Sequence, residues 1–172
     1  MQHFVHHVQQ SEAEGLHQRY YVIHLLVAVA TRGLAAGPGT GIPDLENALG
    51  LVRGKPVEGR DYPWADSIQQ EVIARVVDVT HTLAAWLTEG DNPDMDAARH
   101  AVLRGLDVDE TSEVLYRDWL HIEWATGNNL GVRKVIARLQ QVARLFDISL
   151  EPLTEQTMSL VLSDSHQQVP VR

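Results

Sequence analysis

The chain has 172 residues, of which 44% are hydrophobic and 22% charged, which predicts one folded domain with its own core. It has no cysteine, so disulfides and thiolate metal sites are excluded. The formal net charge of −9, from 14 Lys and Arg against 23 carboxylates, argues against nucleic acid as the main ligand, because binding phosphates needs an excess of cations. We expect a cytoplasmic protein, since the longest apolar run, Tyr20 to Ala30, is too short to span a bilayer.

The first fifty residues predict a tail and two helices. Residues 1–10 are expected to be a flexible N-terminal segment, and they lack the positive start of a signal peptide. A helix is predicted over 11–36, because Ser11 and Glu14 form a capping-box pair and apolar residues then recur every three or four positions. A glycine and a proline end this helix, and a shorter one is expected over 43–53.

The middle of the chain predicts three further helices. Residues 64–89 include many β-branched side chains, but their apolar positions form two helical stripes instead of alternating. Residues 94–105 are expected to form the antiparallel partner of this helix. The next predicted helix, 112–126, is apolar around most of its circumference and must therefore be covered by neighbours on several sides.

The C-terminal third begins with the clearest pattern, a single apolar stripe that predicts a helix over 130–146. A short helix is expected to begin near Thr154, and the tail 164–172 is expected to be frayed. The four tryptophans, Trp64, Trp86, Trp119 and Trp124, are interpreted mainly as core residues.

Two of the expected helix pairs share a repeated pattern. The turn at Gly90 is echoed at Gly127, 37 residues later, and a tetratricopeptide unit has a period of about 34 residues. Hairpins of this kind stack, because no single one can bury its apolar faces alone. The sequence therefore predicts an all-α, tetratricopeptide-like stack of about three antiparallel helical hairpins with a C-terminal capping helix, over residues 11–163.

Patterns that support catalysis are weak. His17 and His24 share a helix face, but a zinc site needs three or four converging ligands. Asp107, Asp109 and Glu110 precede a predicted helix, where the helix dipole stabilises carboxylates without any catalytic role. We expect a protein that is not an enzyme, with no catalytic, cofactor or metal site. An enzyme remains the alternative if a pocket gathers the histidines.

One helix face carries a local positive charge. Arg133, Lys134, Arg138 and Arg144 lie on the polar side of helix 130–146, which contains no acidic residue. The commoner interpretation is a solvated face that offsets acids elsewhere. The functional interpretation is a contact with an acidic protein partner, or a weak contact with a nucleic-acid backbone.

The order of several short motifs resembles the bacterial transcriptional activator domain over residues 43–162. The matching segments are Leu49 to Val57, Tyr62 to Ala65, Arg104 to Asp109, Glu113 to Asp118, Gly127 with Asn128, and Glu151 with Pro152. The resemblance implies a tetratricopeptide-like helical domain found in actinobacterial antibiotic-regulatory activators, where it usually follows a winged-helix DNA-binding domain. Residues 1–42 match less well, and no winged-helix segment precedes the match.

The resemblance also implies a function. In that family the domain serves self-association and contacts with transcription machinery, without a cofactor. We therefore expect a protein-interaction module, part of a longer regulator, that forms homo-oligomers and binds partners on a concave face lined by the first helix of each hairpin. The alternative is a cytosolic interaction domain of a membrane-attached, peptidoglycan-binding fusion.

Overall fold

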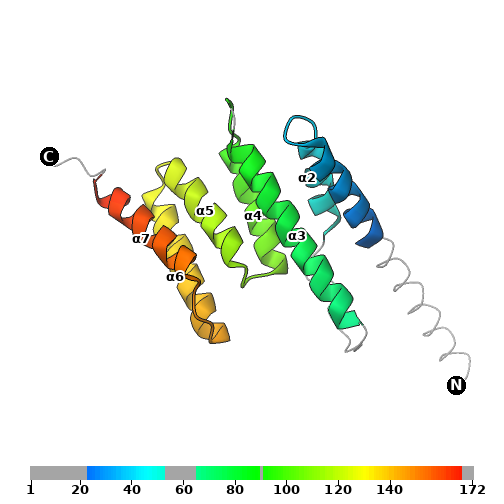
Figure 1. Cartoon of the computed structure of the whole chain (residues 1–172). Coiled ribbons are helices and arrows are strands. Elements are labelled where there is room, and N and C mark those ends of the chain that lie inside the picture. Colours follow the sequence, from blue (N-terminus) through cyan, green and yellow to red (C-terminus); the bar gives the residue numbers. More distant parts are fainter. Residues whose placement is uncertain (1–22, 53–64, 90, 168–172) are drawn as a thin grey trace, which may run out of the picture. The chain divides into compact units, whose positions relative to one another are not determined.

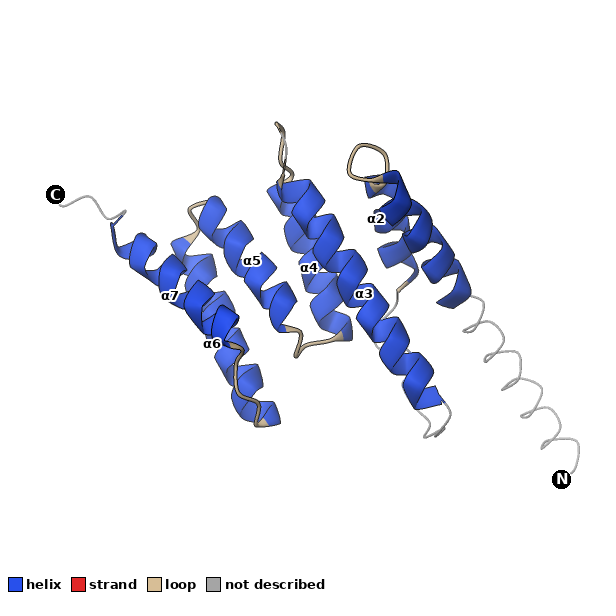
Figure 2. Ribbon diagram, viewed as in Figure 1, coloured by secondary structure: helices blue, strands red, loops and turns tan. Residues whose placement is uncertain are grey.

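The computed structural model describes residues 23–52, 65–89 and 91–167. All regular elements within these ranges are helices, which confirms the all-α class (Figures 1 and 2). The predicted segment 1–10 and the start of the first predicted helix lie outside the described residues. No helix in the described ranges is long and apolar enough to cross a membrane. The chain divides into two compact units, residues 1–75 and 76–172, and each is described by itself.

The first unit contains a helical hairpin. Residues 23–36 are helical, and the next helix is α2 (Ile42–Leu51). Gly37, with a φ of 73°, ends the first of these helices as predicted, since a left-handed backbone favours glycine. α2 lies beside the first helix in Figure 1, and a Cβ on Gly33 would come within 2.7 Å of the Leu45 side chain. The hairpin is therefore closely packed at this glycine.

An ion pair also joins the two helices of this hairpin. The Arg32 guanidinium donates to both carboxylate oxygens of Asp44, at 2.6 Å each. This hydrogen bonding lowers the pKa of Asp44 and raises that of Arg32. Both side chains meet water, so the pair contributes little to stability and mainly fixes the relative register of the helices.

The second unit packs helices mostly against their neighbours in sequence. α3 (Ala65–Thr88) crosses the boundary between the units and is followed by α4 (Met95–Val108), α5 (Glu113–Ala125), α6 (Asn129–Phe146) and α7 (Pro152–Gln167). α5 packs against α4, α6 and α7, and α6 also packs against α7. In Figure 1, α6 lies behind α5 and α7. α5 is thus covered on several sides, as its all-round hydrophobicity predicts.

The burial of α5 agrees with this arrangement. Leu115, Tyr116, Leu120 and Ile122 are almost completely buried. The expectation that the tryptophans are core residues is not confirmed for the described ones, because Trp86 and Trp119 are half-buried and Trp124, at the end of α5, is exposed. Trp64 lies outside the described residues.

The helices that follow the two predicted glycine turns, α4 and α6, both begin with a side-chain N-cap. At the start of α4, the Asp94 carboxylate accepts a hydrogen bond from the Ala97 backbone N–H at 2.9 Å. At the start of α6, the Asn128 side chain accepts one from the Gly131 backbone N–H at 3.0 Å. These N-caps satisfy backbone donors that the helix itself leaves free, so the same device begins the second helix of each pair.

Two helix boundaries differ from the prediction. α4 continues past Gly105 to Val108, because this glycine is not a stop signal: a Cβ here would lie 2.7 Å from both Thr80 and Leu115. The glycine permits α3, α4 and α5 to approach closely. α7 begins at Pro152 and runs to Gln167, so it is longer than predicted. Of the tail 164–172 that was expected to be frayed, residues 164–167 are helical and residues 168–172 lie outside the described residues.

Candidate partner-binding surface

The four cations predicted on the helix 130–146 all lie on α6, whose sequence has no acidic residue. Arg133, Lys134 and Arg144 are exposed. Among the residues that the structure describes, none of these three has an ion-pair or hydrogen-bond partner for its side chain. In a chain with a net charge of −9, this is a local surplus of uncompensated positive charge.

Arg138 behaves differently from the other three. Its guanidinium carbon lies 5.6 Å from the centre of the Trp119 ring on α5, in cation–π geometry. Trp119 in turn stacks on Tyr116, with ring centres 6.5 Å apart. Burial raises the pKa of Tyr116, and the positive charge of Arg138 opposes that rise. Arg138 therefore belongs to the α5–α6 contact, and the structure leaves three of the four predicted cations free for a partner.

Two leucines lie on the same exposed side of α6. Leu130 is 65% exposed and Leu145 is 72% exposed. They lie near the two ends of the helix, fifteen residues apart, which corresponds to about 22 Å along the axis. We call Leu130, Arg133, Lys134, Ala137, Arg144 and Leu145 the outer face of α6.

The combination on this face was not predicted from sequence. The prediction concerned the cations alone, whereas the face carries exposed leucine and positive charge together at each end: Leu130 with Arg133 and Lys134 near the start of α6, and Leu145 with Arg144 in its last turn. The sequence signal was available, since Leu130 and Leu145 fall outside the apolar stripe that packs on α5. A single exposed leucine is unremarkable on a protein surface, and only the pairing with unpartnered cations makes these two informative.

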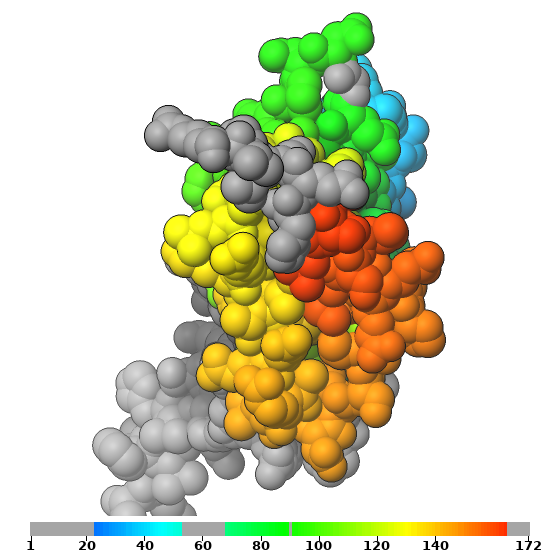
Figure 3. All heavy atoms as spheres, turned by 90° about the vertical axis from the view of Figure 1, so that its left-hand side faces the viewer, coloured from blue at the N-terminus to red at the C-terminus, as the bar shows by residue number. Residues whose placement is uncertain are grey.

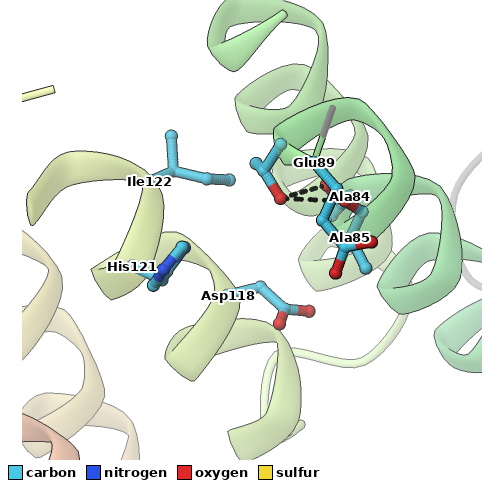
Figure 4. A pocket seen from close by; sticks show the side chains of 7 residues that line it. Ala84, Ala85, Glu89, Asp118, His121 and Ile122 are labelled. Atoms are coloured by element: carbon cyan, nitrogen blue, oxygen red, sulfur yellow. Dashed lines mark hydrogen bonds between the residues drawn. The ribbon is translucent and has the colours of Figure 1, made fainter. Parts of the chain in front are cut away.

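A hollow lies between the end of α3 and α5. It has a volume of about 180 Å³ and is lined by Ala84, Ala85, Thr88, Glu89, Asp118, His121 and Ile122. Figure 4 shows Asp118, His121 and Ile122 projecting from α5 on one side and the α3 residues on the other. The Thr88 hydroxyl already donates hydrogen bonds to the backbone carbonyls of Ala84 and Ala85, at 3.0 Å each.

The carboxyl group of Asp118, which lines this hollow, has a raised pKa. Burial raises its pKa, and a hydrogen bond with the ring of His81 on α3 opposes that rise. The His81 Nδ1 and Asp118 Oδ2 atoms are 2.7 Å apart.

The two histidines that were predicted to share a helix face do not form a site at this hollow. His24 is exposed in the first unit and does not line the hollow. His17 lies outside the described residues. Within the described ranges, no three His, Cys, Asp or Glu side chains are arranged to hold a metal ion.

The most completely bonded charge is Glu123 on α5, which is 3% exposed. Its carboxylate accepts from Arg99 Nε at 2.6 Å, from Trp119 Nε1 at 2.8 Å and from Asn128 Nδ2 at 2.7 Å. Burial would raise the pKa of Glu123, but these hydrogen bonds outweigh it and the pKa is lowered. We call these four residues the Glu123 network. It joins α4, α5 and the turn before α6, and its role is structural.

The Glu123 network could not be inferred from the sequence, because its four members are spread over 30 positions and have no common spacing. The fold and these sites together define an all-α protein of sequentially packed helices with an exposed basic and apolar helix face. No protein-family model, no curated protein and no solved structure matches this chain.

Proposed function

We propose that this chain is a protein-interaction and self-association module of a bacterial transcriptional regulator, and that it acts by binding and not by catalysis. The observation that carries the proposal is the outer face of α6, where three cations without partners lie beside two exposed leucines. The order of turns shared with the bacterial transcriptional activator domain supports the regulator context. The repeated N-caps of α4 and α6 support a tetratricopeptide-like stack.

The chemistry of the outer face favours a protein partner with an acidic, amphipathic helix. Apolar side chains near the two ends of such a helix would cover Leu130 and Leu145, and carboxylates one turn inside one of these ends would pair with Arg133 and Lys134. Arginine forms bidentate pairs with carboxylates, so this face can also orient the partner. Mixed apolar and charged contacts of this kind are the usual way in which a helix binds to a protein surface.

Nucleic-acid binding is the second candidate, and the three free cations favour it. The two candidates differ in what they require of the leucines. Phosphate contacts depend on cations and weaken steeply with salt. An amphipathic helix depends on the leucines as well, since each leucine removed from a buried contact lowers affinity by about tenfold.

The test compares two probes on matched variants. The first probe is a designed helical peptide with leucines fifteen positions apart and glutamates one turn inside each leucine. The second probe is a short DNA duplex. The variants are the charge reversal R133E/K134E and the apolar removal L130S/L145S. We expect fluorescence anisotropy to show peptide binding by the unmodified chain and its loss in both variants.

Each outcome selects one function. If the unmodified chain shifts the duplex and only R133E/K134E abolishes that shift, the nucleic-acid candidate replaces the proposal. If neither probe binds, or if the peptide binds both variants as well as the unmodified chain, the outer face of α6 is a solvated surface and the proposal is wrong.

If the peptide test succeeds, a cross-linker attached to A137C, at the centre of the outer face of α6, identifies the partner in the native cytosol. A74C, at an exposed position of α3, is the control.

A further inference from the structure

The hollow between the end of α3 and α5, which we call the α3–α5 hollow, has a negatively charged lining. Its seven lining residues include two carboxylates, Glu89 on α3 and Asp118 on α5, and no lysine or arginine. The Glu89 side chain is exposed, and among the described residues it has no ion-pair or hydrogen-bond partner. The electrostatic potential of this hollow therefore favours a cation.

The cation nearest to Asp118 along the chain is engaged on the other side of α5. Arg117 donates to Glu151 at 2.6 Å and to Thr154 at 2.8 Å, where α7 begins. Burial raises the pKa of Asp118 by more than the charge of Arg117 lowers it. Figure 3 shows α7 beside α5 and α6 at one side of the second unit. Because α7 holds α5 in place, the wall of the hollow that α5 forms is preorganised for a ligand.

The Asp118 carboxylate has one oxygen available to a ligand. Oδ2 lies 2.7 Å from His81 Nδ1, and Oδ1 has no hydrogen-bond partner in the part of the chain that the structure describes. Figure 4 shows this side chain projecting from α5 toward the residues of α3. Only 17% of the side chain is exposed, so its negative charge is less well solvated than on an open surface. A bound cation would offset this cost.

The size and the walls of the hollow suit a single side chain. Its volume is about 180 Å³, whereas pockets for small-molecule ligands and cofactors have about 300–1,000 Å³. Ala84, Ala85 and Ile122 supply apolar walls, and the two alanines leave the space open because they are small. Apolar walls together with carboxylates suit a long side chain that has a methylene stem and a charged head.

An exposed aromatic side chain lies beside the hollow. The ring of His121, which lines the hollow, is tilted against the ring of Trp124, with centres 6.0 Å apart. Trp124 is 39% exposed. Exposed tryptophans are frequent anchors in protein interfaces. This neighbour favours a protein over a free amine as the source of the cation.

We propose that the α3–α5 hollow binds a lysine side chain of a partner protein. The methylene stem lies against the apolar walls, and the ammonium donates to Asp118 Oδ1 and to the Glu89 carboxylate. Lysine fits better than arginine, because an ammonium has three donors that can turn toward two separate carboxylates. Arginine favours both oxygens of one carboxylate, and His81 already engages Oδ2 of Asp118. This site is additional to the outer face of α6 and does not depend on it.

The first experiment titrates the chain with Nα-acetyl-lysine methylamide, which carries the side chain without backbone charges, and follows the amide signals by NMR. We expect saturable shifts at the residues of the hollow, with a Kd on the order of 1 mM, since one exposed and one half-buried ion pair form. The norleucine compound has the stem without the ammonium and should bind at least about tenfold more weakly. The arginine compound should bind about threefold more weakly.

Matched variants locate the binding. D118N should weaken it by about tenfold and E89Q by about threefold, because Asp118 is the more buried carboxylate. D78N removes the same charge from an exposed position of α3 outside the hollow and should leave binding unchanged. A85L should fill the hollow without changing its charge and abolish binding. Circular dichroism should show the same helix content in all four variants.

The second experiment separates a protein partner from a free amine. Its probes are n-butylamine and a capped pentapeptide whose central lysine is flanked by leucines. We expect the peptide to bind about tenfold more tightly, because its leucines reach the apolar surface beside the hollow. W124A should remove this gain and leave the binding of butylamine unchanged.

Shifts that do not saturate, or that respond to D78N as much as to E89Q, would show a general attraction of cations to an acidic chain and would overturn the inference. Equal binding of the lysine and norleucine compounds would do the same. Butylamine that binds as tightly as the peptide would replace the protein partner by a free amine. None of these variants changes α6, so the result with the acidic helical peptide is independent of this test.

Discussion

The Glu123 network and the outer face of α6 use charged side chains in opposite ways. At Glu123, one buried carboxylate receives hydrogen bonds from three side chains, and its charge is fully compensated. On α6, three cations and two leucines are exposed without partners among the described residues. Complete compensation indicates a structural role, and uncompensated charge beside exposed apolar surface indicates a binding role.

Removing the Glu123 side chain, the centre of the Glu123 network, should lower the free energy of unfolding more than any other change considered. E123A leaves Trp119 Nε1 and Asn128 Nδ2 without their acceptor, and it leaves Arg99 with the exposed Asp96 as its remaining carboxylate partner. We expect a loss of roughly 3–5 kcal/mol in the free energy of unfolding, measured with denaturant, since breaking a buried ion pair leaves buried hydrogen-bond donors without their acceptor. E71A, at an exposed position of α3, is the control and should change little. An equal response of the two variants would remove the structural half of the comparison.

The next largest loss of stability should come from overpacking the contact of α3, α4 and α5 at Gly105. G105A would place a methyl group 2.7 Å from Thr80 and Leu115, both fully buried. We expect a loss of about 1–3 kcal/mol from overpacking, despite the better helix propensity of alanine. A thermal melt measures this change. Stabilisation by G105A would show that α3, α4 and α5 can separate without cost.

The half-buried Asp118 and the buried Glu123 should give opposite dependences of stability on pH. Burial raises the folded-state pKa of Asp118 above its ordinary value, so stability falls as pH rises from the ordinary value through the raised one. Glu123 has a lowered pKa and acts in the opposite direction, since its contribution is lost as pH falls. We expect D118N to remove only the fall in stability with rising pH, as measured by denaturation at a series of pH values. D78N, at an exposed position, should retain that fall.

The smallest effect belongs to the outer face of α6. The triple variant R133A/K134A/R144A should change the free energy of unfolding by no more than about 0.5 kcal/mol per site, because these cations have no partners to lose. The same variant should abolish binding of the acidic peptide. A large loss of stability would show that the three arginine and lysine side chains hold the fold together and are not free for a partner.

The helices were predictable because their signals are local. Apolar spacing located α3, α5 and α6 to within one or two residues, and Gly37 and Gly127 marked helix ends by adopting positive φ values of 73° and 67°. Gly105 was misread as a helix end because its purpose is contact with Thr80 and Leu115, which are distant in sequence.

The candidate site was predictable only in part, for the same reason. The cations of α6 follow from one helix pattern, but the engagement of Arg138 by Trp119 depends on how α5 packs on α6. Glu123 resembles any acidic residue near a helix end until Arg99 from α4 lies 2.6 Å away. Contacts between helices decide which charges are structural, and spacing within one helix does not carry that information.

The central position of α5 has a consequence for synthesis of the chain. Its apolar sides are covered partly by α4, which is made earlier, and partly by α6 and α7, which are made later. While the ribosome is still translating residues 129–167, the leucine and isoleucine side chains of α5 in the nascent chain are exposed to solvent. A truncated product that stops before Pro152 would keep the apolar surface of α5 exposed where α7 normally covers it, and quality-control proteases and chaperones would recognise that surface.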